Sequence, residues 1–364
     1  MVGCQRNFEL PGCLKAPTIN HVETSDMLPL CVMETTVARK LPYTIRHRRK
    51  TYTVRRTQVV NDDKYLLLKK LSRHERWLAL PAHRSEFESL VVVHLLPPSS
   101  LTNERMRVLR RTAANPPFTP SILSCDLGKT SVAIVTDWVR GEILRDYVDR
   151  TSTTDRPISP HESVRLYKGL VQTLCHFHRA TGLVHGDLSP ENIVLRTQGS
   201  GLSLIDFGSA WRMNQAANRE SGDGYRTGYA APEVVDDRAP NELSDQFSAG
   251  VILFEMLTGQ LPYDRLGGNA GRVPGAERTQ LWTPPSELAP LGNGLPRRLW
   301  KQIDRFVRKN LALDSDDRFV SRSDWLDETV RLFDALQAKP TRVLPTGITR
   351  FLSGLLFPKD SDLA

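Results

Sequence analysis

Three short polar motifs, separated by predicted strands and helices, constrain the fold of this chain more than any other feature of its sequence. The first is the run HGDLSPEN at positions 185–192, which leads into the apolar segment 193–195. DFG at 206–208 begins 14 residues after the final asparagine of that run, and APE at 231–233 begins 25 residues after the aspartate of DFG. One such tripeptide arises easily by chance. Three in this order, after a predicted long helix and before further helices, indicate one defined architecture.

The three motifs resemble the catalytic loop, the magnesium motif and the closing motif of the eukaryotic-like (Hanks-type) Ser/Thr protein kinases. The resemblance covers about Lys64 to Ala338. It implies an α+β, two-lobed protein-kinase-like fold with a small β-rich N-lobe and a large helical C-lobe. The coarse pattern agrees, because short β-branched runs such as 90–93 and 131–135 precede Gly141, and helical spacing follows it. The helices predicted from this spacing cover 161–180, 245–257, 296–310 and 325–336. One further helix, over 103–112, is expected before Gly141.

These patterns predict three parts of the chain. We expect an N-terminal extension over 1–60, a kinase-like domain over 61–338 and a C-terminal tail over 339–364. Within the domain, the N-lobe is expected over 61–136, the hinge over 137–141 and the C-lobe over 142–338. The extension is predicted because residues 1–60 contain several prolines and no sustained hydrophobic period.

Most of the basic charge lies in this expected extension. Residues 1–60 hold 10 Lys and Arg against 4 Asp and Glu, while the net charge of the whole chain is +8. The cluster within 46–56 could contact acidic lipid, nucleic acid or an acidic protein, but a solvated basic tail is the simpler interpretation. The amphipathic stretch 348–357 could contact a membrane surface or a partner, or pack on its own lobe.

Composition excludes several other classes of protein. No run of 18 or more apolar residues occurs, so no transmembrane segment is expected. The five cysteines are scattered and form no C-x-x-C pair, which argues against a zinc site or a disulfide framework. We therefore expect a cytoplasmic protein that binds a protein substrate or a regulatory protein and no specific nucleic acid.

The residue types in the motifs suit phosphoryl transfer from ATP. The transferred group carries negative charge that a divalent metal ion neutralises, and Mg²⁺ prefers carboxylate and amide oxygens. Asn192 and Asp206 are therefore the predicted metal ligands. Asp187 is predicted to orient a substrate hydroxyl and to accept its proton. The alternative is that Asp187 caps a turn and that Asn192 satisfies backbone groups.

The resemblance also implies a nucleotide site and its supports. Thr136 corresponds to the gatekeeper, Asp137 and Val139 to the hinge residues that meet adenine, and Glu104 to the helix carboxylate that pairs with the strand lysine. These side chains could equally be packing residues. The resemblance further implies a buried Glu233–Arg318 ion pair, and it implies that Asp245 binds the backbone of the catalytic loop.

The N-lobe departs from the family in its phosphate-binding groups. The loop 72–76, SRHER, contains no glycine, and His94 stands where the strand lysine belongs. Lys69 is the alternative strand lysine, but that register leaves no room for two preceding strands. A lysine is charged at pH 7, whereas histidine is mostly neutral. In the catalytic loop, Gly186 replaces an arginine.

Ser189 replaces the lysine that Ser/Thr kinases place on the transferring phosphate. One lost donor costs about 2.7–4 kcal/mol in the transition state, so two losses would slow catalysis by about four to six orders of magnitude. Arg73, Arg76 and Arg226 are the nearby cations that could substitute.

Three functional hypotheses follow. The first is a Ser/Thr protein kinase that uses ATP and Mg²⁺, with atypical or weakened nucleotide binding. The second is a catalytically impaired pseudokinase that acts as a regulatory or interaction module. The third is a small-molecule phosphotransferase, because His-Gly-Asp followed by Asn also occurs in such enzymes; the DFG and APE motifs speak against it.

Overall fold

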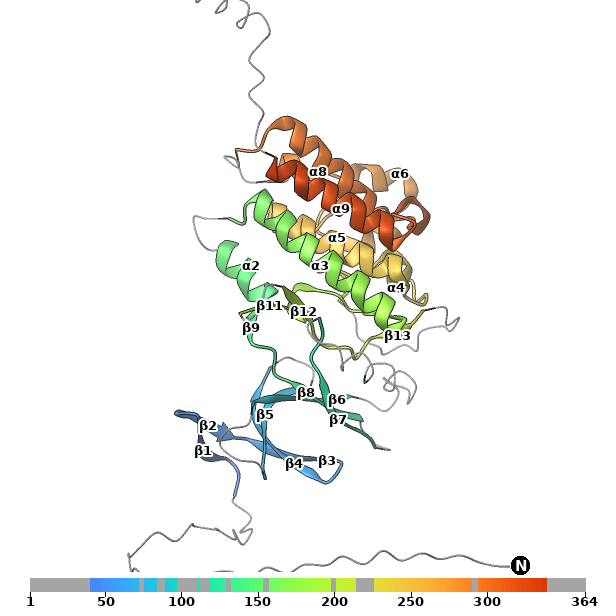
Figure 1. Ribbon diagram of the computed structural model, residues 1–364. Helices are drawn as coiled ribbons and strands as arrows, with labels where there is room; N and C mark the ends of the chain where they lie inside the picture. Colours follow the sequence, from blue (N-terminus) through green and yellow to red (C-terminus); the bar gives the residue numbers. More distant parts are fainter. Residues whose placement is uncertain are drawn as a thin grey trace, which may run out of the picture. The chain divides into compact units, whose positions relative to one another are not determined.

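The computed structural model describes residues 40–71, 75–83, 89–96, 110, 118–128, 132–152, 157–197, 201–213, 226–289 and 294–338. From Leu41 onward they belong to one compact unit. In this unit a small β-rich lobe precedes a larger helical lobe (Figure 1). The predicted α+β, two-lobed architecture is therefore confirmed.

The β-rich lobe contains a six-stranded antiparallel sheet with the order β3-β4-β5-β6-β8-β7. Its strands are β3 (Arg56–Val60), β4 (Asp63–Lys70), β5 (Arg76–Pro81), β6 (Val91–Leu96), β7 (Ile122–Leu127) and β8 (Val132–Asp137). The central strands β6 and β8 are rich in β-branched residues, which favour extended backbone. Val93 and Val135 lie opposite each other in the register and are completely buried, so they anchor the small core of this lobe.

Part of the expected N-terminal extension belongs to this lobe, so the boundary predicted at residue 60 is wrong. Strand β3 pairs with β4, and β1 (Tyr43–His47) and β2 (Lys50–Val54) form a separate hairpin. Each of these strands is five residues long and largely exposed, and it buries its last residue. Such a strand buries too few apolar residues to show a clear period. The basic cluster therefore lies partly on a hairpin, with Arg48 and Arg49 in left-handed conformation at its turn.

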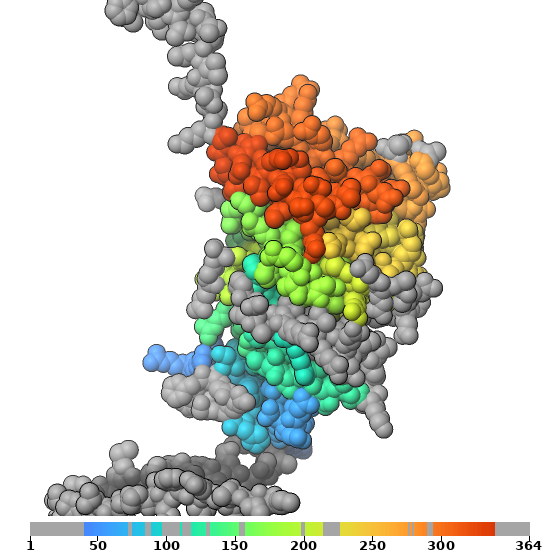
Figure 2. All heavy atoms as spheres, turned by 45° about the vertical axis from the view of Figure 1, so that its right-hand side comes forward, coloured from blue at the N-terminus to red at the C-terminus, as the bar shows by residue number. Residues whose placement is uncertain are grey.

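The helical lobe is built around two long helices. They are α3 (Pro160–Thr181), which Ser159 caps by accepting a hydrogen bond from the Glu162 amide, and α5 (Glu242–Thr258), which begins with a capping box at Asn241. The helices α8 (Arg297–Asn310) and α9 (Arg322–Gln337) pack beside them (Figures 1 and 2). The shorter helices are α2 (Leu144–Ser152), α4 (Pro232–Val235), α6 (Gly275–Arg278) and α7 (Pro285–Leu288). The four helices predicted after Gly141 are present within a few residues of their expected ends, and the helix predicted over 103–112 lies outside the described residues except for position 110.

Short strands hold the polar motifs at the edge of the helical lobe. The strands β9 (Gly141–Ile143), β11 (Ile193–Arg196) and β12 (Leu202–Leu204) form one small sheet, and β10 (Leu183–Val184) pairs with β13 (Trp211–Arg212). The run 185–192 connects β10 to β11, and Asp206 follows β12 by two residues. Because β11 and β12 are neighbours, Asn192 and Asp206 emerge from the same end of this sheet.

The predicted ion pair between Glu233 and Arg318 is present and buried. Arg318 donates from Nη1 and Nη2 to the two carboxylate oxygens of Glu233 over 2.8 and 2.9 Å. The guanidinium is completely buried and also donates to the carbonyl oxygens of Ala312 and Leu243. Burial raises the pKa of Glu233, but the hydrogen bonds and charge of Arg318 outweigh it, so this pKa lies below its ordinary value. The pair joins the APE motif to the region before α9.

Replacing Glu233 by glutamine should destabilise the fold strongly, because Arg318 would remain buried without its counter-charge. We expect Glu233→Gln to lower the free energy of unfolding by about 3–5 kcal/mol at pH 7 in urea denaturation. Since the folded-state pKa of Glu233 is lowered, its stabilisation is present above the unfolded pKa and is lost as the pH falls below about 4. The difference between wild type and variant should therefore shrink in that range.

The matched control is Arg331→Ala, which breaks the exposed Arg331–Glu328 pair on α9. This substitution should change the free energy of unfolding by less than about 1 kcal/mol. Equal effects of the two substitutions would contradict a structural role for the buried pair.

Candidate active site

Asp245, near the start of α5, holds the backbone of the catalytic loop. Its carboxylate accepts hydrogen bonds from the amides of His185, over 2.7 Å, and Gly186, over 3.1 Å. His178 Nε2 lies 2.7 Å from the same carboxylate. Burial raises the pKa of Asp245, but the hydrogen bond and charge of His178 outweigh this effect. The net pKa is below its ordinary value, so the carboxylate stays ionised. The contact implied by the family resemblance is therefore present, and it fixes the loop from the core of the helical lobe.

Gly186 occupies a backbone conformation that accounts for the missing arginine. Its φ is +76°, in the left-handed region. A Cβ at this position would approach the carbonyl oxygen of Ser209 more closely than two non-bonded atoms can. Both the torsion and the close approach favour glycine, so the backbone of this loop leaves no room for a side chain at position 186.

Asp187 and Asn192 face each other across this loop. The Asn192 side-chain amide donates to the Asp187 carbonyl over 2.8 Å and to its carboxylate Oδ2 over 3.3 Å. The amide of Arg226 donates to Asp187 Oδ1 over 3.1 Å. Burial raises the pKa of Asp187 more than the charge of Arg226 lowers it, so its pKa lies above the ordinary value. A raised pKa makes this carboxylate a stronger base than an exposed aspartate.

The side-chain oxygen of Asn192 is left available. Asn192 is completely buried, and its Oδ1 has no hydrogen-bond partner among the residues that the structure describes. A buried acceptor without a partner costs free energy unless a ligand satisfies it. An amide oxygen of this kind is a suitable ligand for a hard cation.

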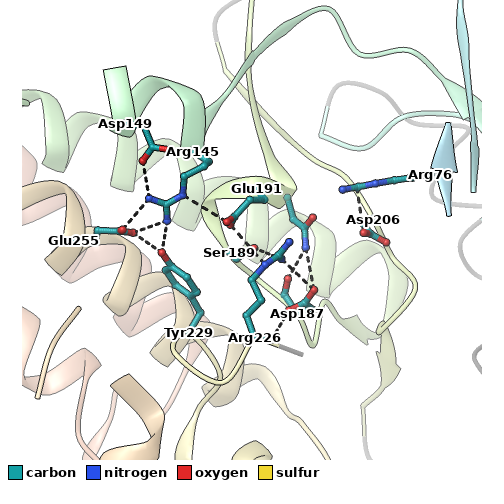
Figure 3. A network of polar contacts seen from close by, with 11 residues as sticks. Arg76, Arg145, Asp149, Asp187, Ser189, Glu191, Asp206, Arg226, Tyr229 and Glu255 are labelled. Carbon is teal, nitrogen blue, oxygen red and sulfur yellow. Dashed lines mark hydrogen bonds and ion pairs between the residues drawn. The ribbon is translucent and has the colours of Figure 1, made fainter. Parts of the chain in front are cut away.

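Asp206 lies beside two basic side chains of the β-rich lobe. Its Oδ2 is 3.1 Å from Arg76 Nη1, and its Oδ1 is 3.5 Å from His94 Nδ1 (Figure 3 shows the Arg76 contact). Burial raises the pKa of Asp206, but His94 and Arg76 lower it more strongly, so the net pKa is below its ordinary value. The next residue, Phe207, stacks on Phe177 of α3 with ring centroids 5.3 Å apart and holds the segment against the helical lobe.

A cleft of about 1070 Å³ opens beside these groups and is lined by both lobes. Its lining includes Val92, His94, Ile134, Thr136, Asp137, Val139, Val194 and Ile205. The predicted hinge residues thus lie in the same cleft as Asp206. The amide of Asp137 already donates to the Ser121 carbonyl over 3.0 Å, so its carbonyl and the backbone of Val139 are the hinge groups to consider for a ligand.

The structure describes every predicted site residue except Glu104. Asp187, Ser189 and Asn192 lie in the loop before β11, and Asp206, His94, Thr136, Asp137 and Val139 line the cleft. Glu104 lies outside the described residues. The stretch 348–357 and three of the five cysteines also lie outside them; Cys125 and Cys175 are free thiols.

Sequence reasoning missed a second polar network next to the cleft. Arg145 of α2 donates to both carboxylate oxygens of Glu255 of α5, over 2.9 and 3.1 Å, and also contacts Tyr229 (Figure 3). Arg145 Nε further lies 3.5 Å from Glu191, within the catalytic loop. The contacts join residues up to 110 positions apart, and no local pattern marks them.

The two-lobed fold is that of the protein kinases. It is similar to the solved structure of the PK-1 kinase of Cydia pomonella granulovirus, with a TM-score of 0.56 and 20% sequence identity over 72% of this chain and 93% of that one. A family model, the protein kinase domain, matches residues 118–323, more than half of the chain. This chain therefore belongs to the protein kinase family.

Relatives by sequence are named as Ser/Thr protein kinases. The chain is 30% identical over 195 residues to a probable serine/threonine-protein kinase, PknB, of Bifidobacterium longum. The aligned region covers 53% of this chain and 26% of the relative. It is 26% identical over 271 residues to the serine/threonine-protein kinase PrkC of Bacillus subtilis. Here the aligned region covers 72% of this chain and 39% of the relative. The chain thus spans well under half the length of either relative. Members of this family generally use ATP and a divalent metal ion.

Replacing Gly186 by alanine tests how strictly the loop geometry depends on glycine. We expect Gly186→Ala to lower the free energy of unfolding by more than about 2 kcal/mol, because the left-handed torsion and the collision with Ser209 both oppose the new side chain.

Gly182→Ala is the matched control. This glycine is also left-handed, with φ +65°, but a Cβ there meets nothing within 4 Å. It should cost only about 1–2 kcal/mol, which is the torsional part alone. Urea denaturation measures both variants, and a smaller loss for Gly186→Ala than for Gly182→Ala would contradict the assigned loop geometry.

Proposed function

We propose that this protein is a Ser/Thr protein kinase that transfers the γ-phosphoryl group of ATP to hydroxyl groups of protein substrates. The proposal is carried by the arrangement of three residues. Asn192 contacts Asp187, and it lies at the same end of the β11–β12 pair as Asp206, which lines the cleft. The buried Asn192 Oδ1 has no partner among the described residues. The relatives named as Ser/Thr kinases support the choice of acceptor.

The donor set fits a magnesium ion. Asn192 offers an amide oxygen, and Asp206 offers a carboxylate that its lowered pKa keeps ionised. Within the described ranges, no group of three or more His, Cys, Asp or Glu side chains is arranged to hold a metal ion without further ligands. Phosphate oxygens of the nucleotide and water would therefore complete the coordination. When bound, the ion would neutralise charge on the phosphate groups.

Asp187 would act on the acceptor. Its carboxylate would accept a hydrogen bond from the substrate hydroxyl and take its proton as the new oxygen–phosphorus bond forms and the bond between the γ-phosphorus and the ADP oxygen breaks. The amides of Asn192 and Arg226 hold this carboxylate in one orientation. The raised pKa of Asp187 suits a group that must accept a proton.

The other hypotheses receive less support. The small-molecule phosphotransferase is disfavoured by the match to the protein kinase domain. The pseudokinase hypothesis was motivated by His94, Ser189 and the glycine-free loop, and none of the comparisons supports it. None of the described helices combines the length and the apolar character needed to cross a bilayer. The cytoplasmic location, the identity of the protein substrate and contact with a membrane surface remain predictions.

Transfer of radiolabel from [γ-³²P]ATP tests the proposal. The full chain should label itself or a general acceptor such as casein in the presence of Mg²⁺. Asp187→Asn should reduce this rate by about 10³-fold or more, because the proton acceptor is lost while the size of the side chain is kept. The matched control is Asp62→Asn, at an exposed turn between β3 and β4, which should keep the wild-type rate.

Two results would contradict the proposal. One is a folded wild-type protein that transfers no label with Mg²⁺ or Mn²⁺ to any acceptor. The other is a rate that Asp187→Asn leaves unchanged. The first result would favour the pseudokinase hypothesis. Label that appears on serine or threonine after acid hydrolysis would establish the acceptor class.

A further inference from the structure

Two arginines stand where the cleft lacks its expected lysines. The family resemblance places one lysine at position 94, on the central strand of the sheet, and another at position 189, in the catalytic loop. This chain has His94 and Ser189 instead. In the structure the side chain next to His94 is Arg76, and the side chain next to Ser189 is Arg226; both arginines line the cleft.

Arg76 reaches the site from the neighbouring strand. It is the first residue of β5 and is the direct cross-strand partner of His94 in the antiparallel register of β5 and β6. Directly opposed residues in such a pair hold their side chains on the same face of the sheet. The guanidinium of Arg76 therefore occupies the space that a long side chain at position 94 would fill, and its Nη1 lies 3.1 Å from Asp206 Oδ2.

The guanidinium of Arg76 has an unused donor, its Nε. The side chain is 9% exposed; its Nη1 is engaged in the ion pair with Asp206, and its buried Nε makes no hydrogen bond to any described residue. Buried donors of a charged group are costly to leave unsatisfied. The cleft that Arg76 lines is where the phosphate groups of a nucleotide would supply acceptors, and a guanidinium suits phosphate oxygens by its planar set of donors.

Arg226 is held by the catalytic loop itself. Its Nη1 donates to Ser189 Oγ over 2.7 Å and lies 3.4 Å from Asp187 Oδ2, while its Nε is 3.9 Å from Glu191 (Figure 3). Ser189 is completely buried, so its small hydroxyl leaves room for the incoming guanidinium and orients it. The charge thus sits beside the proposed base, although residue 226 lies 37 positions after the serine.

We infer that Arg76 and Arg226 are the phosphate-binding cations of this kinase, with Arg76 on the α- and β-phosphates and Arg226 on the transferring γ-phosphoryl group. The inference rests on the proposed function and adds to it two binding residues. In each case a neighbouring segment supplies the positive charge, and a smaller or neutral side chain occupies the position where the family resemblance places the lysine. The two arginines would then replace the missing lysines, and the decrease of about four to six orders of magnitude in catalytic rate would not be expected.

The alternative is that both arginines serve only to neutralise Asp206 and Asp187 in the fold. A purely structural role predicts that truncation lowers stability and leaves the affinity of the folded protein for nucleotide unchanged. A phosphate-binding role predicts that the charge can be returned to its family position with recovery of function.

Moving the first charge tests Arg76. Calorimetric titration of the full chain should give Mg-ADP and Mg-ATP affinities about 10–100-fold weaker for Arg76→Ala, because charged hydrogen bonds to phosphate are lost. The double variant Arg76→Ala/His94→Lys should recover affinity to within about threefold of wild type, since lysine at position 94 lies opposite residue 76. Arg331→Ala, on the surface of α9, is the control for loss of an arginine and should bind both nucleotides like wild type.

Moving the second charge tests Arg226. Arg226→Ala should reduce the rate of phosphoryl transfer by about 10²–10³-fold, while the affinity for Mg-ADP, which lacks the γ-phosphate, stays within about threefold. The double variant Arg226→Ala/Ser189→Lys should transfer phosphate at least about tenfold faster than Arg226→Ala. Thermal unfolding of every variant confirms that the folded protein is the species measured.

The outcomes separate the inference from the proposed function. If wild type transfers phosphate but Arg76→Ala binds nucleotide normally, or neither double variant recovers function, the inference is overturned and the kinase proposal stands. If wild type transfers no phosphate but binds Mg-ATP in a manner that depends on Arg76 and is restored by lysine at 94, the kinase proposal fails and the binding role of Arg76 is supported.

Discussion

Two carboxylates buried beside one cleft create the electrostatic constraint on which the rest of the site depends. The side chains of Asp187 and Asp206 are only 12% and 11% exposed, and isolated buried charges are costly. Burial raises both pKa values, yet the net shifts are opposite: the pKa of Asp206 is lowered by His94 and Arg76, while that of Asp187 remains raised. Environments that push two such pKa values apart prepare one carboxylate to stay ionised and the other to accept a proton.

Rigid supports outside the cleft maintain this arrangement. Asp245 holds the loop backbone through two amides, and the Arg145–Glu255 contact joins α2 to α5 beside it. These groups are fixed by packed helices and not by the loop that they orient. A loop that carries reacting groups can thus be irregular, with left-handed residues at Gly186 and Asp206, because the helical lobe supplies its geometry.

Sequence patterns predict the elements of the helical lobe better than those of the β-rich lobe. Helices α3, α5, α8 and α9 were predicted within a few residues because each repeats its apolar spacing over several turns. Strands β1 to β3 were missed because five-residue strands that bury little more than one residue each show no such repeat. The ion pair of Glu233 and the clamp by Asp245 were expected from the resemblance alone, since no local pattern connects residues 60 or 85 positions apart.

The sequence by itself determined the chemistry that is available: which loops carry carboxylates and amides, in what order, and which lysines are missing. Only the tertiary structure decided where the replacement charges lie. Arg76 meets Asp206 because the antiparallel register of β5 and β6 places it opposite His94, and Arg226 meets Ser189 because the segment before the APE motif folds back over the catalytic loop. Both contacts join residues far apart in the chain. Only strand pairing and helix packing bring these segments together, so no local sequence pattern predicts the contacts.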